Sequence, residues 1–227
     1  MKTLKNVFEQ VVDYDNLYRA YLNARLCKRY RYEVLNFSAH LEDNLVKLQK
    51  ELIDRTYTLG KYREFYIYEP KKRLIMAQPF KDRVVQWAIY QVLNPVFAQG
   101  YITDSYACIK ERGTHKAVKR LHYWLRQVGK KPEKYYFLKL DISKYFYRID
   151  HDVLMGILKR KIRDDDMVFL LDKIVNSSET NFGLPPGKSP GEVKRSDRVS
   201  EKGMPVGNLS SQMFANLYLN ELDQYCK

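Results

Sequence analysis

The chain has 227 residues, of which 45% are hydrophobic, so it can form one large domain or two small ones around a real core. Its 40 basic and 27 acidic residues give a net charge of +13, which favours a polyanionic partner such as nucleic acid, although a merely basic soluble surface also fits. The N-terminus lacks the apolar core of a signal peptide, no apolar run approaches membrane-spanning length, and three scattered cysteines match no zinc spacing. These features exclude an integral membrane protein and a disulfide scaffold, and we expect a cytoplasmic protein.

Tyrosine is frequent, with 19 copies, and many lie beside Lys or Arg, as in the run from Lys28 to Tyr32. Such pairs can stack on bases while the cations meet phosphates. They also fit tyrosines that line the edge of an ordinary core.

The first third of the chain predicts helices. Leu41, Leu45, Leu48 and Leu52 recur at helical spacing, and Ser38 is a candidate N-cap. The period then changes to alternation on both sides of residues 69–72, which predicts a β-hairpin over about 63–78.

Helices and one strand follow the predicted hairpin. A helix is expected from about Phe80 until Asn94-Pro95 ends or kinks it, and another opens at Gly113-Thr114 with Val118, Leu121 and Leu125 inward. The run Tyr135–Asp141 predicts a strand. Further helices are expected from Asp150 or His151 and around Met167–Val175. Residues 181–202, with three Gly and three Pro, predict a polar loop, and the mixture of elements predicts an α+β fold.

Asp141 is the first candidate for chemistry, because it follows an apolar run and is followed by Ile142. Phosphoryl transfer requires Mg²⁺ ions that bridge the reacting oxygens, and carboxylates hold such ions. Taken alone, Asp141 fits a strand-ending cap or an ion-pair partner better than a metal ligand. A second feature is the turn Gly203-Met204-Pro205-Val206-Gly207, which leads into an apolar helix; Gly207 lets backbone approach a ligand closely.

Together these pieces resemble the reverse transcriptases over roughly residues 36–223. Two runs of this chain are similar to conserved motifs of that family. The first polymerase motif is matched by Leu140-Asp141-Ile142-x-x-x-Phe146-x-x-Ile149-Asp150-His151, and the second by Gly203-x-Pro205-x-Gly207-x-x-x-Ser211-Gln212. The fingers region of bacterial members resembles Lys71-x-Arg73-x-Ile75, Pro79-Phe80-x-Asp82-Arg83, Pro95-x-Phe97 and Asp104-Ser105-Tyr106-Ala107. The resemblance implies right-hand polymerase fingers over 1–134 and a partial palm over 135–227 with a small antiparallel sheet.

The resemblance also implies roles for single residues. Asp141 and the Ile142 carbonyl would ligate Mg²⁺, of which the whole enzyme would use two ions. Lys71 and Arg73 would grip the triphosphate, Phe146 would close the pocket against a ribose hydroxyl unless it is an ordinary core residue, and Val206, Gly207 and Gln212 would lie at the nucleotide. Arg83 is either a phosphate contact or a buried partner of Asp82, and His115 would approach the template backbone.

Val206 and Gln212 point to a subtype. Most reverse transcriptases have Gln before this glycine and Pro after the serine, whereas Val206 and Gln212 resemble the enzymes of diversity-generating retroelements. That resemblance implies error-prone copying of a template-repeat RNA into cDNA from deoxynucleoside triphosphates, with a small basic accessory protein as partner. Replacing Gln by Val removes a polar contact that discriminates nucleotides by about 1–3 kcal/mol.

Reverse transcriptases carry further catalytic carboxylates in a Tyr-x-Asp-Asp hairpin after the second motif. No Asp-Asp pair follows Gln212, and Asp164-Asp165-Asp166 precedes it as a loop or N-cap cluster. We therefore expect a truncated enzyme without thumb, inactive in this form. The alternatives are a group II intron or retron-like reverse transcriptase and a non-catalytic RNA-binding module with a polymerase-like fold.

Overall fold

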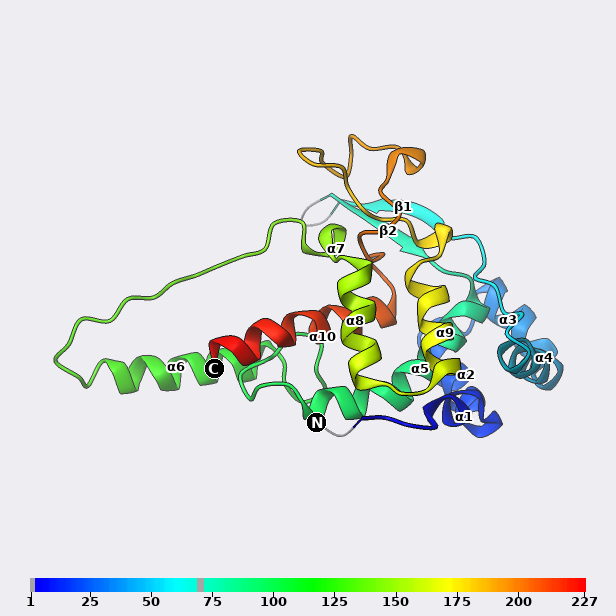
Figure 1. The fold of residues 1–227 in the computed structure, drawn as a ribbon, viewed down its shortest axis with the longest axis horizontal. Helices are drawn as coiled ribbons and strands as arrows, with labels where there is room; N and C mark the ends of the chain where they lie inside the picture. Colours follow the sequence, from blue (N-terminus) through cyan, green and yellow to red (C-terminus); the bar gives the residue numbers. More distant parts are fainter. Residues whose placement is uncertain (1–2, 69–71) are drawn as a thin grey trace.

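The computed structural model describes residues 3–68 and 72–227, which are mainly helical (Figure 1). The helices, in chain order, are α1 (Val7–Val12), α2 (Tyr14–Ala24), α3 (Tyr32–Ala39), α4 (Leu41–Ile53), α5 (Phe80–Gln99), α6 (Thr114–Val128), α7 (Tyr145–Arg148), α8 (His151–Lys161), α9 (Asp165–Val175) and α10 (Leu209–Cys226). Strands β1 (Arg63–Ile67) and β2 (Arg73–Ala77) form an antiparallel hairpin. The predicted helix-rich α+β class with a small antiparallel sheet is confirmed.

Helix α5 is the centre of the core and packs against α1, α2, α3 and α10. Val84, Val85, Ala88 and Ile89 are fully buried, as their helical spacing predicts. Of the two predicted effects of Asn94-Pro95, an end or a kink, the end does not occur, because α5 continues through Pro95 to Gln99. Packing of the last turn through Phe97, which is 1% exposed, offsets the hydrogen bond that a proline removes.

The N-terminal helices follow their apolar pattern. Leu45, Leu48 and Leu52 of α4 are buried as predicted. Ser38 is not an N-cap, however, since it lies within α3 and its hydroxyl donates to the Val34 carbonyl at 2.7 Å. A serine inside a helix satisfies its hydroxyl in this way without starting a new helix.

The hairpin was predicted at the right place. Strand β1 pairs with β2 from Arg63↔Ala77 to Ile67↔Arg73, and Leu74 and Met76 are buried beneath the hairpin. They form a small second core with Tyr62 and Phe182, separate from the core around α5. The hairpin is tied to the glycine turn, because the Met76 amide donates to the Val206 carbonyl at 3.2 Å.

Helices α8 and α9 begin at aspartate N-caps. Asp150 accepts a hydrogen bond from the Val153 amide at 3.1 Å, and Asp164 accepts one from Met167 at 3.0 Å. The start at Asp150 was one of the two that the sequence predicts for α8, and α9 begins near its predicted place. Helix α8 packs against α9 and α10, and α10 packs against α5. The turn at 203–207 leads into α10 from the side of the hairpin (Figure 1).

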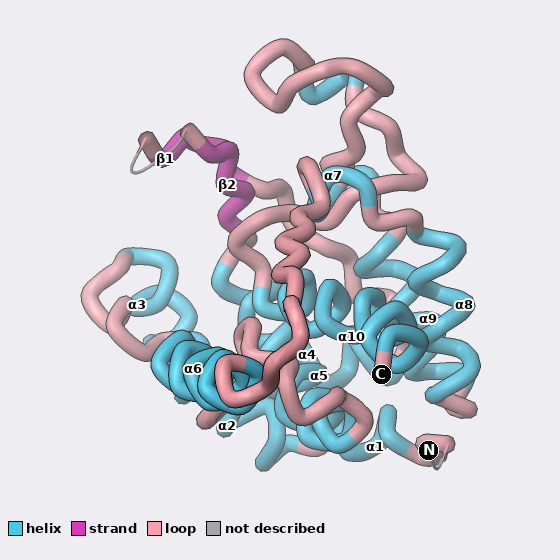
Figure 2. Tube along the Cα trace, turned by 90° about the vertical axis from the view of Figure 1, so that its left-hand side faces the viewer, coloured by secondary structure: helices cyan, strands magenta, loops and turns pink. Residues whose placement is uncertain are grey.

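Helix α6 and the residues that follow it were predicted incorrectly in part. The helix forms, but none of its residues is buried, and Val118, Leu121 and Leu125 are 59%, 43% and 54% exposed. Tyr135–Asp141 is an extended segment without strand pairing, seen as the long trace that leaves α6 and returns to α7 (Figures 1 and 2). A strand requires a hydrogen-bonding neighbour, and no described strand lies beside this run.

Residues 181–202 form the predicted irregular loop, with a 3₁₀ turn at Arg195–Asp197. Its ends are fixed: Phe182 is fully buried and stacks on Tyr147, and the Val199 amide donates to the Gly183 carbonyl at 3.1 Å. The loop therefore lies against the hairpin and the segment before α8.

Candidate nucleic-acid interface

The glycine turn before α10 has the backbone conformation that its sequence predicts. Gly203 and Gly207 have φ angles of +90° and +115°, which only glycine adopts without strain. A Cβ atom at Gly207 would lie 3.2 Å from Ile75 Cγ2, so the turn backbone lies directly against β2. The missing side chain therefore permits the close approach of turn and hairpin.

A groove of about 340 Å³ opens between this turn, the hairpin and the loop from α2 to α3. Gly207 and Gln212 line it from one side and Arg83 of α5 lines it from another, although these residues lie more than a hundred positions apart in the sequence. The other lining residues are Lys28, Arg31, Arg63, Phe65, Ile75, Met76, Ala77, Gln78, Trp87 and Leu209. Cations and aromatic rings on the walls, with no carboxylate among them, are the surface that a nucleic-acid strand requires.

Arg83 lies at the floor of this groove, with only 12% of its side chain exposed. Its Nη2 donates at 3.4 Å to Glu33 Oε1 and to the Gln78 carbonyl, which are long contacts. Among the described residues its Nη1 is buried and has no hydrogen-bond partner. A buried guanidinium nitrogen without an acceptor is costly, so the arrangement is suited to an anionic ligand.

Asp82 is not the partner of Arg83. Its carboxylate accepts hydrogen bonds from the Tyr57 hydroxyl and the Gly60 amide, both at 2.8 Å. Burial raises the pKa of this carboxyl, and the two hydrogen bonds oppose that shift. The alternative that Arg83 exists to neutralise Asp82 is therefore wrong in this structure.

The cations of the groove repel one another. Burial lowers the pKa of Lys28, and the charges of Arg83 and Arg31 lower it further, while Glu33 acts in the opposite direction. A phosphate bound between these groups would relieve the repulsion and complete the hydrogen bonding of Arg83.

A buried polar network supports the start of α10. The Asn208 amide and Gln86 donate to the Tyr62 hydroxyl at 3.1 and 3.5 Å, and Tyr62 donates to Gln78 at 3.2 Å. Burial raises the pKa of Tyr62, so the phenol stays protonated. The network joins α5, the residue before β1 and the turn, and so fixes the wall that carries Gly207.

Other predicted residues lie outside the groove wall. Arg73 is exposed at the start of β2, and Lys71 lies outside the described residues. Val206 is half-buried and packs against the small core of Tyr62, Leu74, Met76 and Phe182. Phe146 of α7 is also half-buried and contacts both cores, which fits the interpretation as a core residue.

A comparison with family models matches residues 68–227 to the reverse transcriptases, described as RNA-dependent DNA polymerases. The chain belongs to the reverse transcriptase family. Among curated relatives, it is 29% identical to "Protein YkfC" of Escherichia coli over 82% of this chain and 46% of that protein. It is 27% identical to "Group II intron-encoded protein LtrA" of Lactococcus lactis over 81% of this chain and 28% of that protein. The chain thus spans less than half the length of these relatives.

Among solved structures, the comparison gives the "Partial Cas6-RT-Cas1--Cas2 complex", at 15% identity and a TM-score of 0.49. The match covers 96% of this chain and 34% of that one. In residues 3–68 and 72–227, no helix combines the length and hydrophobicity that a membrane span requires.

Reverse transcriptases use Mg²⁺, but the described residues do not by themselves make a site for it. Asp141 and Ile142 lie in the exposed extended segment, and no described group of three or more acidic, His or Cys side chains could hold a metal ion. One carboxylate without partners does not fix two ions, and we derive no metal-dependent step from this geometry. His115 is exposed on α6 and is not among the residues that line the groove.

Sequence reasoning missed Arg31, Arg63 and Trp87 as members of the groove. The run Lys28–Tyr32 indicates nucleic-acid contact, because cations lie beside tyrosines there. Nothing in the run shows which of its side chains line the groove. Arg63 and Trp87 are ordinary residues of a strand and a helix until the fold brings them together.

Proposed function

We propose that this chain is the template- and nucleotide-binding part of an RNA-directed DNA polymerase that copies RNA into cDNA from deoxynucleoside triphosphates. The observation that carries this proposal is the groove in which Gly207, Gln212 and the unsatisfied Arg83 meet. In this proposal residues 1–134 are the fingers and 135–227 are part of the palm. Arg73 and Lys71 then contact the triphosphate, and Asp141 with the Ile142 carbonyl contributes to the Mg²⁺ site of the whole protein.

The groove supports binding of a strand more directly than it supports chemistry. Its cations can neutralise phosphates, and Trp87 and Phe65 offer faces on which bases can stack. Gly207 and Gln212 line the groove beside these groups, and Gln212 is exposed where it can contact the templating nucleotide. His115 would contact the template farther from the groove.

The subtype proposed is that of diversity-generating retroelements, supported by Val206 and Gln212. It includes error-prone copying of a template-repeat RNA and a small basic accessory protein as partner. Val206 packs on the small core, so any effect of Val206 on fidelity acts through the turn that carries Gly207.

A second candidate is a group II intron-type reverse transcriptase, which the 27% identity to LtrA favours. The two candidates differ in error spectrum. Val206→Gln in the whole natural protein should lower misincorporation opposite adenine if the first candidate holds, because the longer, polar side chain would reposition the turn that carries Gly207. Deep sequencing of cDNA that both proteins copy from one template measures the error spectrum. Because the new amide enters an apolar cluster, primer extension by the two proteins should be compared under conditions where both are equally folded.

The general proposal is tested by primer extension on an RNA template with deoxynucleotides and Mg²⁺. The whole natural protein should extend the primer and Asp141→Asn should abolish extension, whereas the 227-residue chain should bind RNA without extending it. Extension by this chain that depends on Asp141 would overturn the expectation of inactivity. Extension by the Asp141→Asn whole protein would remove Asp141 from the catalytic site.

Arg73→Ala in the whole protein separates nucleotide from template binding. We expect a larger loss for the triphosphate than for RNA, because Arg73 can bind a triphosphate bidentately. Equal losses would make Arg73 a general phosphate contact.

A further inference from the structure

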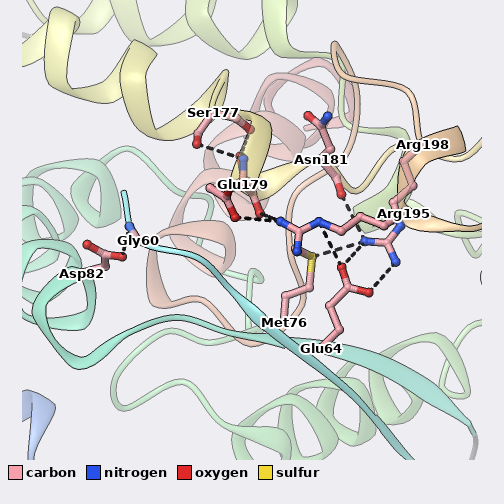
Figure 3. A network of polar contacts seen from close by, with 10 residues as sticks. Gly60, Glu64, Met76, Asp82, Ser177, Glu179, Asn181, Arg195 and Arg198 are labelled. Atoms are coloured by element: carbon pink, nitrogen blue, oxygen red, sulfur yellow. Dashed lines mark hydrogen bonds and ion pairs between the residues drawn. The ribbon is translucent and has the colours of Figure 1, made fainter. Parts of the chain in front are cut away.

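We propose that residues Ser177–Arg198 form a brace that sets the position of the hairpin, and that the Arg198–Glu64 ion pair is its positioning contact (Figure 3). The part of this inference that concerns nucleotide use rests on the proposed function, whereas the bracing of the hairpin does not.

Arg198 makes the principal contact of the brace. Its Nη1 and Nη2 donate to the two carboxylate oxygens of Glu64 at 2.7 and 2.9 Å. Nη1 also donates to the Asn181 carbonyl at 3.3 Å and lies 3.8 Å from the Met76 sulfur. The Arg198 side chain is 5% exposed and that of Glu64 is 24% exposed, so water screens the pair weakly.

Arg195 extends the same network. Its Nη2 donates to Glu179 Oε2 at 2.8 Å, and its Nε lies 3.7 Å from Glu64 Oε1. The Ser177 hydroxyl caps the Glu179 amide at 3.2 Å and so fixes the 3₁₀ turn Ser178–Thr180. Glu64 of β1 therefore meets two arginines from a segment more than a hundred residues away, which Figure 3 shows converging on one carboxylate.

The brace is itself attached to the rest of the molecule. Phe182 stacks on Tyr147 with ring centroids 4.3 Å apart, and Gly183 pairs with Val199. A Cβ atom at Gly183 would lie 2.5 Å from the Lys202 carbonyl oxygen, so Gly183 of the brace is in direct backbone contact with the segment that follows the brace. Movement of the brace is thereby coupled to the segment that leads into Gly203.

The hairpin is consequently held along both strands. Arg198 holds Glu64 of β1, while the Val206 carbonyl accepts a hydrogen bond from Met76 of β2. Glu64 and Met76 are direct partners across the hairpin. Because Arg73 lies on β2, the brace fixes the position of Arg73 relative to the glycine turn, and Arg198 acts through the hairpin without touching a substrate.

Hydrogen exchange in the 227-residue chain tests the brace without requiring catalysis. Arg198→Gln should speed exchange of the 63–67 and 73–77 amides about tenfold, while α5 and α9 keep their rates, because a buried charge loses its partner locally. The matched control is Arg160→Gln, which removes an arginine from the Glu221 pair, whose side chains are 65% and 46% exposed. This control should change exchange less than about twofold.

Arg198→Lys keeps the charge but loses the two-pronged fork, so its hairpin exchange should lie between those of the unchanged chain and Arg198→Gln. In the whole natural protein, Arg198→Gln should raise the KM for deoxynucleotides about threefold or more and should change kcat less. Arg198→Lys should partly restore the KM.

Unchanged hairpin exchange in a folded Arg198→Gln chain would overturn the brace. Equal acceleration in the hairpin and in α5 would show general destabilisation instead, and would also overturn it. If exchange changes as expected but the whole protein does not extend primers even with Arg198 present, the proposed function fails while the brace stands. A normal KM with a loosened hairpin would remove the link between brace and nucleotide.

Discussion

Helix α5 follows Pro79 and helix α6 follows Gly113, and both helices carry apolar residues at helical spacing. Leu93 of α5 is fully buried, whereas Leu125 of α6 is 54% exposed. The extended residues 129–144 that follow α6 are also open to solvent, with Leu138 and Leu140 77% and 80% exposed.

The difference lies in the neighbours that each region has. A periodic apolar face specifies the conformation of its own segment, but its burial depends on a second element that the pattern does not contain. The described chain supplies four helices against α5 and buries no residue of α6. We call residues 114–144 the open region and the helices around α5 the packed region.

The largest expected contrast is between leucines of the two regions. Leu93→Ala should lower the free energy of unfolding by about 3–5 kcal/mol, because it leaves a cavity in the packed region. Leu125→Ala should change it by less than about 0.5 kcal/mol. Urea unfolding of the two variants measures both values, and comparable losses would show that α6 is covered in solution.

Two glycines outside the open region show the same dependence on neighbours. Gly203→Ala should cost about 2–4 kcal/mol, because φ is +90° and the new Cβ would lie 2.7 Å from backbone atoms of residues 182 and 183. Gly156→Ala in α8 has open space around the new Cβ and should stabilise by about 0.5–1 kcal/mol. Thermal unfolding of both variants is the measurement, and a neutral Gly203→Ala would refute the described crossing of the two segments.

A smaller effect concerns the pH dependence that Asp82 gives to the packed region. Burial raises the pKa of Asp82 in the folded state above its unfolded value of about 4. The protonated carboxyl therefore contributes its full stabilisation below the unfolded pKa. This contribution is lost as pH rises through the raised pKa of the folded state. Asp82→Asn should remove that fall while costing about 1–2 kcal/mol in hydrogen bonds to Tyr57 and Gly60.

Unfolding free energies from pH 3 to 7 test this prediction, with Asp141→Asn of the open region as the control. A profile for Asp82→Asn that keeps the same fall with rising pH would assign the fall to another group.

Local signals in the sequence predicted the hairpin, a helix start at Asp150 or His151, and the glycine turn, and they left the Asp164 cluster as a loop or an N-cap. Each depends on a few neighbouring residues and on backbone conformation, as the positive φ of Gly207 shows. The strand at Tyr135–Asp141 was predicted wrongly because a run of aromatic and aliphatic residues describes a segment that could pair, while pairing itself is a long-range event.

The candidate site was predictable in part for the same reason. Gly207 and Gln212 belong to one continuous motif, and Arg83 to another, so each was found in the sequence. Their meeting with Arg31 and Arg63, and the pairing of Glu64 with Arg198, depend on contacts between distant segments. No local pattern in the chain indicates those contacts.

The central claim is that the groove floored by Arg83 binds a nucleic-acid strand. Its most direct test is the affinity of the 227-residue chain for single-stranded RNA as a function of salt, for Arg83→Gln and for the control Arg160→Gln. We expect Arg83→Gln to weaken binding by about 1–2 kcal/mol and to reduce the slope of log K against log salt by about 0.7, the loss of one phosphate contact. Arg160→Gln should leave both nearly unchanged. Equal affinities and equal slopes for the unchanged chain and Arg83→Gln would contradict the claim.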